Sequence, residues 1–110
     1  MTEIRLNDFS LSPEQEKLLD SLFHGDSDTC IIHYISDFRS AKILREITDT
    51  LCKNFGIIPK WRTRIVLILD ELHNNAIEYG SKVGDINTFI LKLEKPSKNI
   101  FRFEASVIDS

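Results

Sequence analysis

Residues 64–80 read RIVLILDELHNNAIEYG, and this stretch decides the fold because an apolar helix passes directly into a polar one. Its first half contains five consecutive apolar residues, from Ile65 to Leu69. Such a run covers more than half of a helix circumference, and a helix of that kind is enclosed by other elements on most sides. We therefore expect a largely enclosed helix over residues 60–79. Its apolar stripe comprises Trp61, Ile65, Ile68, Leu72, Ala76 and Tyr79.

The second half of the stretch carries carboxylates and amides at helical spacing. Glu71, Asn75 and Glu78 stand at i, i+4 and i+7, so they form one line along the helix, with Asn74 beside them. The simpler interpretation is a solvated stripe, because charged side chains on helices usually face water. The alternative is a ligand site, in which a carboxylate acts as a general base while a carboxamide oxygen one turn away binds a hard cation such as Mg²⁺. Spacing alone leaves both interpretations open.

Length and composition describe one ordinary folded domain. The chain has 110 residues, of which 42% are hydrophobic and 28% charged, enough for a single modest core. The net charge of −3 offers no basic patch for nucleic acid or an anionic membrane. No segment reaches the ~18 apolar residues of a membrane span, and two scattered cysteines suit a reducing compartment. We therefore expect a cytoplasmic protein without nucleic-acid or membrane partners.

The order of predicted elements indicates an α/β (α+β) two-layer sandwich. The predicted elements are a helix over 12–25, a strand over 29–35, helices over 38–55 and 60–79, and a hairpin formed by 85–95 and 99–109. The first helix has Ser12 as its N-cap, Gln15 to close a capping box and Gly25 as its terminator. We expect residues 1–28 to form an N-terminal helical appendage. The other helices should pack on one face of a mixed, mostly antiparallel sheet.

The segment RIVLILDELHNNAIEYG resembles the N-box helix of the GHKL (Bergerat-fold) ATPase and kinase superfamily, and most closely that of the bacterial anti-sigma-factor serine/threonine kinases. The family pattern E-x-x-x-N-A-I-x-H/Y-G is matched by Glu71, Asn75, Ala76, Ile77, Tyr79 and Gly80. The order of strand, helix, N-box helix and hairpin also follows the family. Residues 29–110 thus resemble the N-terminal part of a histidine-kinase-like ATPase domain.

The resemblance implies a protein kinase that binds ATP and Mg²⁺. Asn75 would be the metal ligand that ties Mg²⁺ to the nucleotide phosphates, and Glu71 would be the catalytic base that takes the proton from the acceptor hydroxyl. Tyr79 belongs to the cofactor-binding pattern. Asp109 falls where the D-x-G-x-G motif of the family binds the adenine amino group. The implied partners are a sigma factor and an anti-anti-sigma protein.

The chain departs from the family after Asp109, because the motif glycines, the ATP lid and the final strands do not follow within these 110 residues. We therefore expect an incomplete Bergerat fold that is inactive alone, with an open sheet edge that favours swapping or a homodimer. Two alternatives stay open. One is a catalytically inactive GHKL-like regulatory binding module. The other is a histidine-kinase catalytic domain, although that class usually has Asn at the position of Glu71 and a basic residue at that of Glu78.

The remaining polar and aromatic residues receive simpler interpretations. His24, His33 and His73 lack a second His or Cys at ligand spacing, so we expect no zinc site. Asp70 should cap the helix or pair locally, for example with a nearby arginine, while Tyr34 and Trp61 should be core or interface aromatics.

Overall fold

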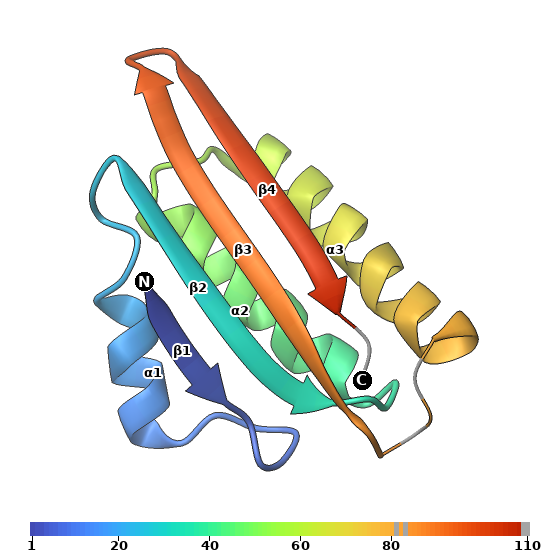
Figure 1. The fold of residues 1–110 in the computed structure, drawn as a ribbon. Coiled ribbons are helices and arrows are strands. Elements are labelled where there is room, and N and C mark those ends of the chain that lie inside the picture. Colours follow the sequence, from blue (N-terminus) through green and yellow to red (C-terminus); the bar gives the residue numbers. More distant parts are fainter. Residues whose placement is uncertain (81, 83, 109–110) are drawn as a thin grey trace.

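The computed structural model describes residues 1–80, 82 and 84–108. In chain order, their helices and strands are β1 (Thr2–Arg5), α1 (Pro13–Asp20), β2 (Ser27–Ile35), α2 (Ser40–Asn54), α3 (Pro59–Tyr79), β3 (Ile86–Ser97) and β4 (Ile100–Ile108). Figure 1 shows two layers, with the helices on one face of the sheet. Among the described helices, none combines the length and apolar character needed to cross a bilayer.

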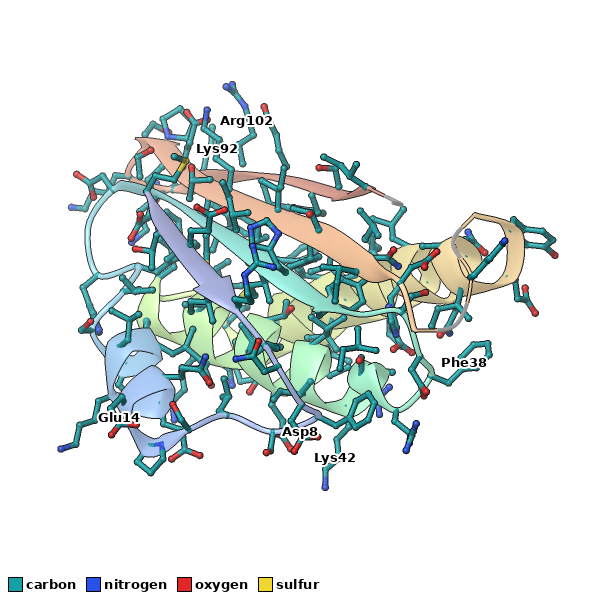
Figure 2. The ribbon with its side chains drawn as sticks, turned by 60° about the horizontal axis from the view of Figure 1, so that its bottom comes forward. Asp8, Glu14, Phe38, Lys42, Lys92 and Arg102 are labelled. Atoms are coloured by element: carbon teal, nitrogen blue, oxygen red, sulfur yellow. The ribbon has the colours of Figure 1, made fainter. Side chains whose placement is uncertain are left out.

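The strands stand in the spatial order β1-β2-β3-β4. The first pair is parallel, and the other two pairs are antiparallel. None of the described helices lies on the other face of this sheet, from which Lys92 and Arg102 project (Figure 2). The predicted two-layer sandwich, with helices on one face of a mixed, mostly antiparallel sheet, is therefore confirmed.

The core forms where alternating strand residues meet the apolar faces of the helices. The buried strand residues include Cys30, Ile32, Tyr34, Phe89, Leu91 and Leu93, and those of α2 include Ile43, Ile47 and Leu51. The inward face of β4 is only half buried, although it packs against this core. In the described part of the chain β4 has a neighbour on one side only, so its other edge is open.

The first 28 residues contribute more to the fold than a docked helix. β1, which the sequence did not predict, pairs with β2, and the backbone N–H of Leu6 donates to the carbonyl of His33 at 2.8 Å. Ile4 and Leu6 are 3% and 2% exposed and belong to the same core as the residues of β2. The N-terminal segment therefore extends the sheet by one strand.

α1 is shorter than predicted. The capping box is confirmed, because Ser12 Oγ accepts from the N–H of Gln15 at 3.1 Å and the Gln15 side chain accepts from the N–H of Ser12. The helix then ends at Asp20 and not near Gly25, since both the N–H and the hydroxyl of Ser21 donate to the carbonyl of Leu18. This local bond competes with continuation of the helix.

The hairpin turn lies slightly later than the predicted Pro96-Ser97-Lys98. Ser97 pairs with Ile100, which leaves a two-residue turn, and the ladder is irregular between Glu94 and Ser97. Pro96 lies within this irregularity, because a proline cannot donate a hydrogen bond to a regular ladder. The two strands of the hairpin, expected over 85–95 and 99–109, form close to these ranges.

α3 is less enclosed than predicted. It contacts α2 and β4, and its buried residues are Ile65, Leu69, His73, Ala76 and Ile77. Leu67 and Ile68 are 63% and 45% exposed, while Trp61 and Tyr79 of the expected apolar stripe are also exposed. The prediction of a helix covered on most sides was wrong, because β4 is an edge strand and nothing in the described chain covers the far flank of α3.

Candidate functional site

The candidate site lies on the C-terminal half of α3. Glu71 and Asn75 stand one helical turn apart, about 6 Å along the axis, and both side chains are exposed. Glu78 and Tyr79 are exposed as well, and Tyr79 keeps 83% of its surface accessible. Asn74 is half buried. The polar stripe therefore faces solvent, as the simpler interpretation of the spacing expects.

The two principal side chains of the site are available to a ligand. Within the described part of the chain, neither the Glu71 carboxylate nor the Asn75 carboxamide makes a hydrogen bond or an ion pair. Neither lines any of the main cavities formed by the described residues. Carboxylate and carboxamide oxygens are hard ligands of the kind that Mg²⁺ prefers. The donor chemistry thus fits a magnesium ion, although these residues form no pocket around it.

Protein side chains alone would not complete a metal site here. Among the described residues, no group of three or more His, Cys, Asp or Glu side chains could hold a metal ion. Mg²⁺ commonly takes one or two protein ligands together with substrate phosphates and water. A cation at Asn75 would therefore need oxygen atoms from a ligand such as a nucleotide.

The end of β4 lies toward this half of α3. Figure 1 shows β4 and α3 running in the same direction across the molecule, and the two elements are in contact. The last residue of β4 is Ile108. Asp109, the predicted adenine ligand, lies outside the described residues. The structure thus places the described end of β4 toward the half of α3 that carries Glu71 and Asn75.

A buried polar layer lies under α3, and the sequence interpretation missed it. His73 is 1% exposed, and its Nδ1 lies 3.0 Å from the hydroxyl of Tyr34. Asn87, the cross-strand neighbour of Tyr34, is fully buried, and its side-chain amide has no hydrogen-bond partner among the described residues. Buried polar groups of this kind restrict how a helix can be rotated against a sheet. The sequence did contain a signal for the burial of His73, because this residue follows the apolar Leu69 by four positions and so lies on the same face of the helix.

Burial determines the charge state of His73. Removal of the imidazole from water lowers its pKa, and the nearby carboxylate of Asp70 opposes this effect. Asp70 also accepts a hydrogen bond from Arg45 on α2 at 2.9 Å, so the predicted pairing of Asp70 with an arginine is confirmed. The neutral imidazole and this ion pair both attach α3 to its neighbours.

The two cysteines are not candidate nucleophiles. Cys30 and Cys52 are free and buried, and burial raises the pKa of each thiol to about 12. Both thiols therefore remain protonated at neutral pH, whereas the thiolate is the reactive form.

No protein-family model, curated protein or solved structure matched the chain. A functional assignment therefore rests on the residues of the chain itself.

Proposed function

We propose that the protein is a cytoplasmic ATP-binding serine/threonine kinase of the anti-sigma-factor type within the GHKL superfamily. One observation carries most of this proposal: Glu71 and Asn75 are exposed, without partners in the described chain, on the half of α3 toward which β4 runs. The order β2, α2, α3, β3, β4 also agrees with the order that the resemblance implies. The proposed partners are a sigma factor and an anti-anti-sigma protein.

Each site residue has a proposed role that follows from its chemistry. The carboxamide oxygen of Asn75 would hold Mg²⁺ together with phosphate oxygens, and the bound metal would neutralise charge that develops on the phosphates. The carboxylate of Glu71, one turn away, would accept the proton of the acceptor hydroxyl. Tyr79 presents its exposed ring near the same end of the helix, and Asp109 would accept a hydrogen bond from adenine.

Titration of the full-length protein with Mg²⁺-ATP by isothermal calorimetry tests the binding site. Asn75→Ala removes the metal ligand, so we expect the dissociation constant to rise at least about tenfold, which corresponds to ~1.4 kcal/mol. Asn74→Ala is the matched control, since it removes the same amide one position away, and its affinity should stay within about twofold. Absence of binding by the unmodified protein, or equal affinity in Asn75→Ala, would contradict the site.

Removal of the proposed base tests the catalytic role. Glu71→Gln keeps the shape of the side chain and loses its basicity, so Mg²⁺-ATP should bind normally while phosphoryl transfer to a serine acceptor slows at least about 100-fold. Glu78→Gln is the matched control, because it makes the same change on the same exposed stripe. Transfer by Glu71→Gln at the rate of the unmodified protein would remove Glu71 from this role.

A second candidate function is a regulatory binding module that docks on a partner without phosphorylating it. The observation that favours it is the absence of Glu71 and Asn75 from the main cavities of the described residues. The calorimetric titration separates the two candidates. A folded full-length protein that binds no Mg²⁺-ATP supports the binding module and excludes the kinase.

A further inference from the structure

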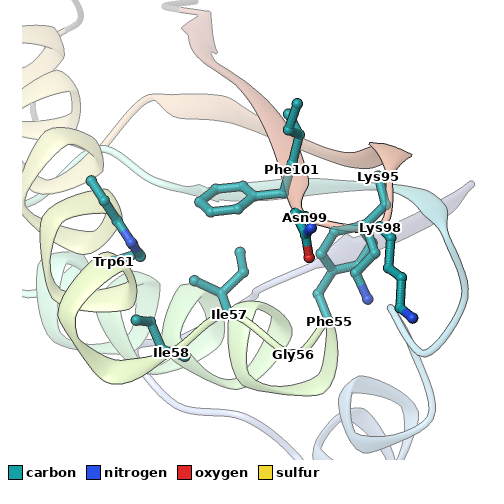
Figure 3. Close-up of a pocket in the computed structure, with 10 residues that line it drawn as sticks. Phe55, Gly56, Ile57, Ile58, Trp61, Lys95, Lys98, Asn99 and Phe101 are labelled. Atoms are coloured by element: carbon teal, nitrogen blue, oxygen red, sulfur yellow. The ribbon is translucent and has the colours of Figure 1, made fainter.

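A recess lies at the end of α3 opposite the candidate site. The loop between α2 and α3 forms one wall, the hairpin turn between β3 and β4 forms the other, and the cavity has a volume of about 240 Å³. Figure 3 shows Ile57, Trp61 and the ring of Phe101 around the recess, with Lys95 and Lys98 beside Phe55. The recess is therefore separate from Glu71 and Asn75, which lie more than two turns farther along the helix.

The recess has a buried apolar floor and an exposed apolar rim. Phe55 and Ile57 are 1% and 5% exposed, whereas Ile58, Trp61 and Ile100 on the rim are 56%, 41% and 60% exposed. Scattered exposed apolar residues are normal, but three around one concave recess form a contiguous patch. Patches of this kind often mark interaction sites.

Two lysines line this apolar recess, and two further cations flank its tryptophan. Lys95 Nζ lies 4.6 Å from the centre of the Phe55 ring, and Lys60 and Arg64 lie over the Trp61 ring at 5.7 and 4.7 Å. Together with Lys98 they make four positive charges on a chain whose net charge is −3. In the described part of the chain none of the four forms an ion pair. Their charges are thus available to an acidic ligand.

We propose that this recess docks an acidic peptide segment of a partner protein, which inserts one bulky apolar side chain. The cavity is larger than the ~150 Å³ that accommodates a benzene ring, and smaller than the roughly 300–1,000 Å³ of sites for drug-sized ligands. It therefore matches a single Phe or Leu side chain. The acidic residues that flank this anchor would meet Lys95, Lys98, Lys60 and Arg64. A concave site takes a protruding side chain better than it takes a membrane surface.

Fluorescence of Trp61 offers a direct measurement, because this residue lines the recess and is the one tryptophan of the chain. The probe is a synthetic peptide with a central Phe between runs of Glu, compared with the same peptide carrying Ala in place of Phe. We expect a saturable change of Trp61 emission with the Phe peptide and at least tenfold weaker binding of the Ala peptide. Binding should weaken further between about 50 and about 300 mM salt, as screening increases.

Substitutions in the recess test whether the peptide binds there. The double substitution Lys95→Glu with Lys98→Glu should weaken peptide binding at least tenfold. Ile100→Glu should also weaken it, and the fold should tolerate this change because Ile100 is 60% exposed. Lys42→Glu is the matched control: it lies on the helix side of the molecule (Figure 2), near the start of α2 and about 20 Å along that helix from Phe55. Thermal unfolding followed by circular dichroism verifies that each variant is folded.

Four outcomes would overturn the proposal. One is equal binding of the Phe and Ala peptides, and another is a loss of binding in Lys42→Glu as large as in the double variant. A third is a change of Trp61 emission with vesicles containing phosphatidylglycerol but not with the Phe peptide, which would assign the recess to a membrane. The fourth is a dimer, measured by analytical ultracentrifugation, that the double variant abolishes, since a second copy of the chain would then occupy the recess.

Discussion

His73 is a buried side chain with a titratable group, and this combination makes stability depend on pH. Because burial lowers its pKa in the folded protein, the unfolded chain binds a proton first as the pH falls below about 6.5. Protonation then favours the unfolded state. The free energy of unfolding should therefore decrease as the pH falls below about 6.5, until the pH reaches the lowered pKa of the folded protein.

His73→Phe tests this linkage by chemical denaturation at several pH values. The variant keeps an aromatic ring and loses both the titration and the hydrogen bond to Tyr34, so we expect roughly 1 kcal/mol less stability at pH 7. Its stability should also fall less steeply than that of the unmodified protein as the pH is lowered to 5. His24→Phe is the control, because it makes the same substitution at a histidine that is exposed to solvent. If the stability of His73→Phe depended on pH as steeply as that of the unmodified protein, His73 would not be the source of the pH dependence.

At the scale of single elements, the sequence predicted what depends on local spacing. The long helices, the long strands and the capping box of α1 follow from residues within one or two turns of each other, and they form where expected. The rotation of α3 was not predictable in this way, because Ile68 has the same local spacing as a core residue and is exposed only because β4 is an edge strand. β1 was missed for a related reason: four residues that pair in parallel with a distant strand carry little local signal.

In the candidate site, too, the sequence predicted the features that depend on local spacing and not those that depend on packing between elements. Sequence spacing correctly placed Glu71 and Asn75 on one face of a helix, which is a local property. It left open whether this face is exposed to solvent, and it did not predict the burial of His73 and Asn87. Those properties depend on which elements pack against α3, and helix periodicity does not specify them.

The helix α3 connects the two proposed sites. Trp61 at the recess and Asn75 at the proposed nucleotide site are about 20 Å apart along one helix. The core face between them packs on α2 and the sheet. A partner that docks at the recess would thus be held at a fixed distance from Glu71, which restricts which part of that partner can approach this proposed base.

The burial of the N-terminal segment predicts that residues 1–28 unfold together with the rest of the chain. Leu6 is 2% exposed in the shared core, so Leu6→Ala should lower the free energy of unfolding by about 2–5 kcal/mol. Trp61 lies on α3, away from β1, and its fluorescence reports the unfolding of the main domain. Denaturation followed by this signal should shift to lower denaturant concentration and stay coincident with the circular dichroism transition.

The control Leu18→Ala removes the same atoms from a residue that is 39% exposed, and it should shift the midpoint much less. If residues 1–28 were an independent appendage, Leu6→Ala would leave the Trp61 transition in place.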